Sequence, residues 1–547
     1  MERRYDGVGG GGGGVHQAQM VAVRDPDADH SFDLMDMLND DGAGSKQNLT
    51  VQDISDMTRL GNKQEFRRNF HSLSIFGLTC VLLCTWVAIL STTQLSMING
   101  GQAGTIWVYV AAWVFTMPVA ASMAEMASMA PTAGGQYHWV SEFAPKSMQR
   151  PFSYLAGWLG ALGWQTGLGY FGFQCASTIL TVASLGNPSY VVKPWHETLL
   201  TIAIGIFAIL FNIFGAKRLP LFEGVLLCCF FLGFFAITIP LWVLAPKAPA
   251  REVFGSFANY GDWASVGAAC IVSQTSTASA FFGVDSAAHM SEEVRRASTT
   301  VPRMMMLTIA VNGFLGLVMI ITFVFAVQDV QQQFVDSTET YPFIGVFYTA
   351  CGNSSAAAIG MTVPVILMTF STCINSVMAA SRQAWAFARD NGTPFPRWFS
   401  KIVVVDDTPI PINSMITSIT ILVIVALVNL GGSEIVNSIT GLSGAAFGST
   451  YSLSIGCVLW RRLFGEPLPE AKWSLGRWGV PINIVALLYQ VFSFIMSFFP
   501  VYRAVTAASM NWSIAVFGGV CIIAFVNYIF HGRRRYVGPV VRIVKDR

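Results

Sequence analysis

The sequence is built from long apolar stretches that are separated by short polar segments. Each stretch is close to the roughly 20 helical residues needed to cross the hydrocarbon core of a bilayer. Their approximate bounds are 72–97, 105–129, 152–185, 198–213, 219–244, 265–289, 302–327, 356–388, 411–430, 435–460, 480–499 and 512–530. The sequence therefore predicts an all-α integral membrane protein of about twelve transmembrane helices.

Few charged residues interrupt these stretches. Charged residues form 12% of the chain and hydrophobic residues 53%, whereas a soluble domain carries about 25% charged residues. Much of the outer surface must therefore contact the lipid bilayer. The net charge of +2 excludes the strongly basic profile of a nucleic-acid-binding protein. The 10 cysteines have no metal-ligand or redox spacing, so we expect them to pack as small hydrophobic residues.

Lysine and arginine residues fall mostly on one side of the predicted helices. If the N-terminus is cytoplasmic, the outer side keeps only Lys193, Lys247, Arg251 and Arg503. This asymmetry is the one that the positive-inside rule requires, and an even number of crossings places both termini in the cytoplasm. The predicted organisation is a disordered cytoplasmic tail (1–70), a transmembrane domain (71–532) and a cytoplasmic C-terminal tail (533–547).

Two of the predicted helices turn polar along their length. The first carries a polar run within residues 85–94, and the sixth carries one within residues 273–285. In transporters, helices broken at matching positions of two repeats free backbone groups near the bilayer midplane and form the substrate site. The alternative is that these serines and threonines bond only to their own helix backbone. Both interpretations stay open at this point.

Three motifs lie on the predicted cytoplasmic side. They are PTAGGQYHW at residues 131–139, GVDSAAHMSEEV at 283–294 and SRQAWAFARDNGTP at 381–394. With these three motifs in this order and spacing, the chain resembles the amino acid–polyamine–organocation (APC) superfamily, specifically its fungal amino acid/choline/GABA permease branch. The resemblance covers roughly residues 70–537.

The resemblance implies a fold and a mechanism. The fold has two inverted five-helix repeats, over about 71–245 and 263–460, with two peripheral helices over about 478–532. A substrate pocket is expected where the first and sixth segments unwind, with alternating access and usually proton coupling. The implied substrate-binding residues are Trp86, Val87, Ala88, Ala280, Phe281, Phe282 and Gly283. Tyr170 and Asn375 are added from their positions on the third and eighth segments.

The position after Trp86 is informative. Relatives in this branch often have an acidic residue there, whereas this chain has Val87. The missing counter-charge argues against recognition of choline or a polyamine by charge pairing. An aromatic cage of Trp86, Phe281, Phe282 and Tyr170 could still bind a quaternary ammonium by cation–π attraction. Ordinary aromatic packing is the equally supported alternative.

Ionisable residues inside the membrane are functional candidates, because burying them is costly. Glu125, Glu223 and Asp285 could each carry a coupling proton, or each could pair structurally with Arg382, Arg389 or Lys217. Structural pairing is favoured for Glu125 and Glu223, and Asp285 stays undecided. Glu292 has the i,i+4 spacing of a surface pair with Arg296, but the motif favours a cytoplasmic gate. The coupling or gating candidates are Glu125, Asp285, Glu292 and Arg382.

Other classes of protein fit less well. No phosphate loop, metal-spaced His/Cys cluster or nucleophile elbow is present, so we expect no enzyme, cofactor or metal. A major facilitator fold would need a long central loop, and the sixth-to-seventh link at 289–301 is short. A nutrient sensor or an exchanger of an internal membrane remains an alternative. The prediction is a plasma-membrane permease that imports a small amine-bearing solute, such as an amino acid, GABA or choline, with a proton.

Overall fold

The computed structural model describes residues 49–61, 64–337, 340–431, 435–506 and 509–539, which fold almost entirely as helices. The helices are α3 (Val51–Arg59), α4 (Ser72–Leu83), α5 (Thr85–Met129), α6 (Gln136–Phe143), α7 (Gln149–Gly186), α8 (Pro194–Phe214), α9 (Leu219–Leu244), α10 (Ala250–Gly255), α11 (Val266–Ser279), α12 (Ser286–His289), α13 (Ala297–Ala326), α14 (Phe343–Ala350), α15 (Ser355–Arg389), α16 (Pro396–Phe399), α17 (Ile412–Val428), α18 (Ile435–Phe464), α19 (Gly479–Met496), α20 (Ser513–Asn527) and α21 (Arg533–Arg535). The antiparallel hairpin of β1 (Val403–Val405) and β2 (Thr408–Ile410) lies between α16 and α17.

Within the described ranges, nine helices are long and apolar enough to cross a membrane, and α17 is a shorter apolar helix. One of the nine is the 58-residue stretch Ser72–Met129, which joins α4 and α5. Inside α5 the backbone is not helical at Gly101, where φ is 66°. A Cβ at Gly101 would lie 2.8 Å from the backbone nitrogen of Ala258, so only glycine fits at this kink in the helix. The expected count of twelve crossings stays a prediction.

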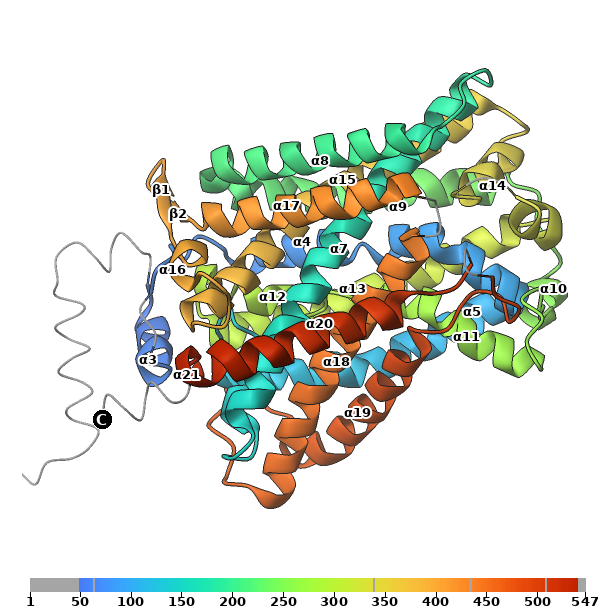
Figure 1. The fold of residues 1–547 in the computed structure, drawn as a ribbon. Helices are drawn as coiled ribbons and strands as arrows, with labels where there is room; N and C mark the ends of the chain where they lie inside the picture. The colour runs from blue at the N-terminus through green and yellow to red at the C-terminus, as the bar shows by residue number, and fades with distance from the viewer. Residues whose placement is uncertain (1–48, 62–63, 338–339, 432–434, 507–508, 540–547) are drawn as a thin grey trace, which may run out of the picture. The chain divides into compact units, whose positions relative to one another are not determined.

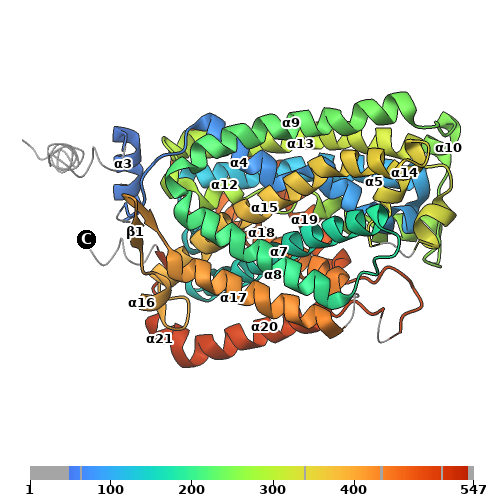
Figure 2. The same ribbon diagram turned by 90° about the horizontal axis from the view of Figure 1, so that it is seen from above.

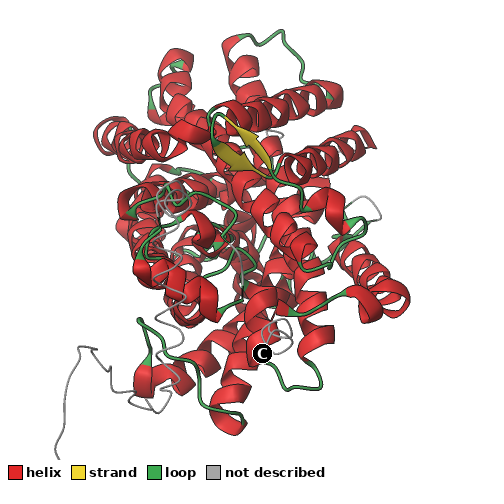
Figure 3. Ribbon diagram, turned by 90° about the vertical axis from the view of Figure 1, so that its left-hand side faces the viewer, coloured by secondary structure: helices red, strands yellow, loops and turns green. Residues whose placement is uncertain are grey.

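The long helices run side by side (Figures 1 and 2). At one end lie α3, α16, α21 and the β-hairpin, which Figure 3 shows in the foreground; at the other end lie α10 and α14. We call these the α3 end and the α10 end. Since α3 and α21 are the first and last described helices, both termini of the described chain lie at the α3 end.

The helices differ in how deeply they are buried. Helix α5 packs along α11 and α13, and α7 packs along α15 and α18, so these form the interior of the bundle. Helix α20 instead exposes large apolar side chains, including Ile522 at 65% and Phe525 at 63%. An apolar surface of this kind is stable only against lipid or a partner. The interior helices therefore carry the buried polar groups described below.

Part of the predicted N-terminal tail is ordered. Residues 1–48 lie outside the described part of the chain, but Val51–Arg59 forms α3. The helix starts with a capping box, in which the Thr50 side chain accepts a hydrogen bond from the backbone of Asp53 and the Asp53 side chain accepts one from the backbone of Thr50. Its Asp53 forms an ion pair with Arg68, with 3.1 Å between Oδ1 and Nη1, and both side chains are buried.

Candidate functional site

The first crossing is broken at Cys84, one residue before the polar run of 85–94, which is itself helical. Cys84 takes a left-handed conformation (φ 34°, ψ 52°) between α4 and α5, which is unfavourable for any residue other than glycine. The break is held by groups from other helices. The Thr85 amide donates to Oδ1 of Asn312 on α13 at 3.0 Å, and the Thr85 hydroxyl donates to the carbonyl of Ala280 at 3.0 Å.

The second break lies between α11 and α12, over residues 280–285. Gly283 has a φ of +87°, and a Cβ there would lie 3.0 Å from Cδ2 of Leu82 and 3.3 Å from the Trp164 ring. Both the backbone conformation and the close approach therefore require glycine. Since the Thr85 hydroxyl reaches Ala280, the two breaks are in direct contact.

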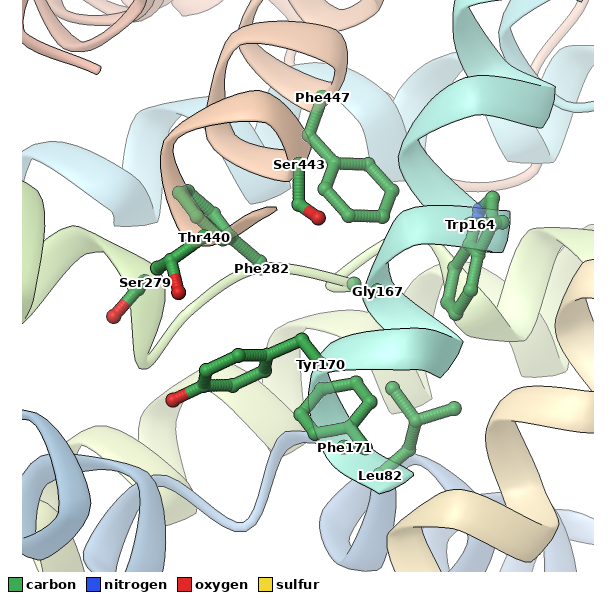
Figure 4. A pocket seen from close by; sticks show the side chains of 11 residues that line it. Leu82, Trp164, Gly167, Tyr170, Phe171, Ser279, Phe282, Thr440, Ser443 and Phe447 are labelled. Atoms are coloured by element: carbon green, nitrogen blue, oxygen red, sulfur yellow. The ribbon is translucent and has the colours of Figure 1, made fainter. Parts of the chain in front are cut away.

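A small cavity lies beside the two breaks (Figure 4). Its lining residues come from α4, α7, the second break and α18, and they are Leu82, Trp164, Gly167, Tyr170, Phe171, Ser279, Phe282, Gly283, Thr440, Ser443 and Phe447. Apart from three hydroxyl-bearing residues and the Tyr170 phenol, this lining is apolar and largely aromatic. No charged side chain is among these described residues. We call this cavity the central pocket.

The structure brings together only some of the predicted binding residues. Tyr170, Phe282 and Gly283 line the central pocket. Phe281 turns away and packs against Tyr109, with 5.6 Å between ring centroids. Ala280 is buried at the break, where its carbonyl accepts from Thr85.

The residues predicted on the first segment lie beside the pocket, not in its lining. Trp86 is fully buried and packs against Phe230 and Phe234 of α9, at centroid distances of 6.0 and 6.3 Å. Val87 and Ala88 start α5, and their carbonyls accept hydrogen bonds from Ser91 and Thr92. A binding role for Trp86, Val87 and Ala88 stays a prediction.

Asn375 and Glu223 form a separate buried contact. The Asn375 amide nitrogen donates to Glu223 Oε2 at 3.1 Å and to the Leu78 carbonyl at 3.4 Å. This contact ties α15 to α9 and α4. The expected pairing of Glu223 with a basic residue is wrong, because no cation in the described chain lies within ion-pair distance of it. Its other oxygen, Oε1, has no hydrogen-bond partner.

Asp285 lies directly behind the wall of the central pocket. Its Oδ2 accepts from the Trp164 indole at 3.3 Å and from Gln136 at 2.7 Å, and its Oδ1 accepts from the Tyr451 hydroxyl at 2.6 Å. The fourth partner is His289, whose Nε2 lies 3.0 Å from Oδ2. Asp285 and His289 are both buried, with 1% of each side chain exposed. The carboxylate thus connects the pocket wall to α6, α12 and α18.

His289 lies between two acceptors. Its Nδ1 is 2.8 Å from the carbonyl oxygen of Ala133, and its Nε2 faces Asp285. A carbonyl oxygen can only accept, so Nδ1 carries a proton. The second contact also needs a proton, which comes from Nε2–H or from a protonated Asp285. The sequence signal was the i,i+4 spacing of Asp285 and His289.

The gating candidates form ion pairs at the α3 end. Both oxygens of Glu292 accept from Arg389, at 2.9 and 3.0 Å, and Oε1 also accepts from the Ala133 amide at 3.3 Å. The alternative surface pair of Glu292 with Arg296 does not form in the described chain, because the backbone is left-handed at Arg296 and Glu292 pairs with Arg389. Arg382 donates to Glu293 at 2.8 Å.

Glu125 is paired structurally, as favoured, but with a different partner. It forms an ion pair with Arg462 of α18 and accepts from the Ser474 hydroxyl at 3.0 Å and the Leu475 amide at 2.9 Å. Arg382, Arg389 and Lys217, the partners expected from the sequence, are not involved in these contacts. Together with Glu292–Arg389 and Glu293–Arg382, this pair links α5, α15, α18 and the segment after α12 at the α3 end.

A second, wider cavity leads toward the α10 end. It has about 1740 Å³ of space, part of it open to solvent, and its lining includes the loops before α14 and α20. Tyr170, Ser279 and Thr440 line both this cavity and the central pocket. We call the wider cavity the outer chamber. The central pocket is therefore reached from the α10 end, while ion pairs cross the α3 end.

Comparison with known proteins agrees with this geometry. The profile described as amino acid permease matches residues 71–520. An uncharacterized amino-acid permease of Schizosaccharomyces pombe is 28% identical over 503 residues, covering 90% of each chain. The choline transporter of Saccharomyces cerevisiae is 27% identical over 509 residues, covering 90% of this chain and 88% of its own. A manganese transporter from Eremococcus coleocola has a similar fold, with a TM-score of 0.52 at 11% identity over 87% of this chain and 95% of its own.

Proposed function

The chain belongs to the amino acid permease family, and on this premise we propose that it imports a small amine-bearing solute by proton-coupled alternating access. It is a multi-pass membrane transporter and not an enzyme. The proposed solute is an amino acid, GABA or choline. The proposed orientation places the α3 end in the cytoplasm and the central pocket open toward the outside of the plasma membrane.

The observation that carries the proposal is the central pocket between the two helix breaks. Its aromatic lining suits a compact solute, and its hydroxyl groups can accept hydrogen bonds from an ammonium group. Broken helices also leave backbone groups free to bind the polar part of a substrate. The remaining predicted residues, Trp86, Val87, Ala88, Ala280 and Phe281, support this pocket from the two breaks.

The pair of Asp285 and His289 supports proton coupling. It is buried next to the pocket wall through the Trp164 indole, and its contacts form a path between the pocket and Ala133 at the α3 end. Ala133 also bonds to Glu292, so a change in the protonation of His289 would reach the Glu292–Arg389 ion pair. Protonation would thus affect the ion pair that has to separate when the α3 end opens.

The first test is uptake of radiolabelled GABA, choline and a panel of amino acids by cells that lack their own permeases. We expect saturable uptake of at least one solute that a protonophore abolishes. Phe282→Ala should lower this uptake, because the ring lines the pocket. Phe235→Ala is the control, since that ring is 46% exposed on the outer surface of α9. No uptake of any solute, with protein at the cell surface, would overturn the importer proposal.

The second test separates coupling from structure. Asp285→Asn removes the carboxylate of the proton-holding pair, so accumulation should fall by about tenfold or more and lose its response to the protonophore. Glu252→Gln is the control, because it removes an exposed carboxylate of α10 that the pocket and the Asp285–His289 pair do not contact. If Asp285→Asn still accumulates solute in a protonophore-sensitive way, the pair does not carry the coupling proton.

A further inference from the structure

One charged side chain lines the outer chamber. Among its described lining residues, which are otherwise hydroxyl-bearing, amide or apolar, Glu197 alone carries a formal charge. Glu197 lies in the first turn of α8, near the α10 end. The central pocket itself contains no carboxylate. A solute that moves toward the pocket would therefore pass the negative charge of Glu197 in the chamber before it reaches the helix breaks.

Neutral donors hold the Glu197 carboxylate in place. Asn429 donates its amide to Oε2 at 2.8 Å, and the Ser177 hydroxyl of α7 donates to Oε1. Both contacts are donated to the carboxylate, so they fix its position. The N-terminus of α8 adds a favourable partial positive charge. The side chain is fixed between α7, α8 and the end of α17, with its charge directed at the chamber.

No basic residue neutralises this charge within the described chain. Glu125, Asp285, Glu292 and Glu293 each lie within ion-pair distance of an arginine or histidine, whereas Glu197 does not. The nearest basic residues in sequence are Lys193 and His196, and the His196 ring is bonded to the Tyr190 hydroxyl at 2.8 Å. Binding a cation would stabilise a half-buried carboxylate that has no counter-charge.

Two tyrosines accompany Glu197 in the chamber. Tyr170 and Tyr341 both line it, and Tyr170 continues into the central pocket. In Figure 4 the Tyr170 hydroxyl points to the side of the pocket where Ser279 and Thr440 lie. The face of a tyrosine ring attracts an ammonium group, most strongly where water is excluded. The carboxylate and the two rings together suit a compact organic cation.

We propose that Glu197, with Tyr170 and Tyr341, forms an entry site for a cationic amine, so that the transporter prefers solutes with a net positive charge over zwitterionic amino acids. This inference rests on the proposed function and narrows its substrate class. The carboxylate missing at Val87 is then replaced by one from α8. An ammonium group would bind at Glu197 first and move along Tyr170 into the central pocket.

The test compares Glu197→Gln with wild type for two substrates, choline as the cation and a neutral zwitterionic amino acid. We expect KM for choline to rise by about tenfold or more while kcat stays within about twofold, with little change for the zwitterion. A merely structural role would affect both substrates alike, because glutamine can still accept from Asn429. The control Glu252→Gln removes an exposed carboxylate of α10, outside the chamber lining, and should change neither KM.

A binding measurement distinguishes this inference from the proposed function. Purified protein is melted with choline chloride or tetramethylammonium chloride, against sodium chloride at equal ionic strength. We expect the organic cations to raise Tm in wild type and not in Glu197→Gln. An equal rise in both proteins overturns the entry site. A rise that depends on Glu197, in a protein that takes up no solute, overturns the importer proposal and leaves the cation site in place.

Discussion

His138 is enclosed in α6, where only 2% of it is exposed. Burial, with the positive charges of Arg389 and Arg59 nearby, lowers the pKa of His138 to about 3. Below pH 6.5 the unfolded chain takes up a proton that the folded protein does not bind, so stability falls with pH, by about 2 kcal/mol at pH 5. We expect Tm to fall between pH 7.5 and 5 in wild type, and to fall less in His138→Gln.

Differential scanning fluorimetry of the detergent-solubilised protein measures this difference. His71→Gln controls for the loss of a histidine as such, because the His71 ring is exposed at the start of α4. If His138→Gln loses Tm with pH as steeply as wild type, the folded protein does not hold His138 in its neutral form.

Some of the residues that line the central pocket were predicted from the sequence. Phe282 and Gly283 were predicted because the resemblance to the APC superfamily places them where the sixth segment unwinds. Trp164 and Phe447 were missed, since each lies in a long apolar helix in which several faces are buried. Which face meets the pocket depends on the rotation of the helix, and hydropathy does not encode that rotation. Glu197 was missed because the sequence shows no link between the start of α8 and the pocket.

Among the elements, the break between α4 and α5 depends on a side chain from α13. Asn312 accepts the Thr85 amide, which the break leaves without a helical partner. Asn312→Ala would leave that buried amide unpaired and should lower stability by about 1–3 kcal/mol. Asn413→Ala, at the exposed start of α17, should have a much smaller effect on Tm. Equal Tm values for Asn312→Ala and wild type would mean that another group satisfies the amide.

The predicted break in the sixth segment is found at residues 280–285, whereas the first segment breaks at Cys84, just before its predicted polar run. A break in each segment was predictable because polar residues and glycine are unusual in a membrane helix. Helix α3 was not predicted, although the Thr50–Asp53 capping box was visible in the sequence. Its polar composition suggested a disordered tail, and only tertiary contacts such as the Arg68–Asp53 ion pair show why it folds.

For the whole molecule, closure of the α3 end depends on pairs between distant helices. Glu292→Arg should weaken uptake and stability, because it leaves Arg389 facing a like charge, and loss of a buried pair costs about 3–5 kcal/mol. The double variant Glu292→Arg/Arg389→Glu should recover part of both. A double-mutant cycle on uptake and Tm measures the recovery. Additive losses would show that the two residues do not act as a pair.

The resemblance to the APC superfamily, predicted from three motifs, is confirmed by the family match over residues 71–520. The bundle was predictable because crossing a membrane restricts a chain to apolar helices. The partner of Glu125 was not, because Arg462 lies 337 residues away and a single sequence carries no record of which distant charges meet. The predicted crossing count differs from the nine long apolar helices of the described chain for two reasons: the stretch Ser72–Met129 joins the first two predicted segments, and α11 and α17 have only 14 and 17 residues.

The width of the outer chamber determines where the membrane voltage acts. Solution that enters a space of about 1740 Å³ carries the potential of the α10 side down to the central pocket. In the proposed orientation, the voltage would fall mainly across the layer of residues between Trp164 and the ion pairs of the α3 end. Each elementary charge that crosses this layer gains or loses about 2.3 kcal/mol per 100 mV. Because His289 lies within the layer, import of a cation with a proton would generate an inward current that grows as the cell becomes more negative inside.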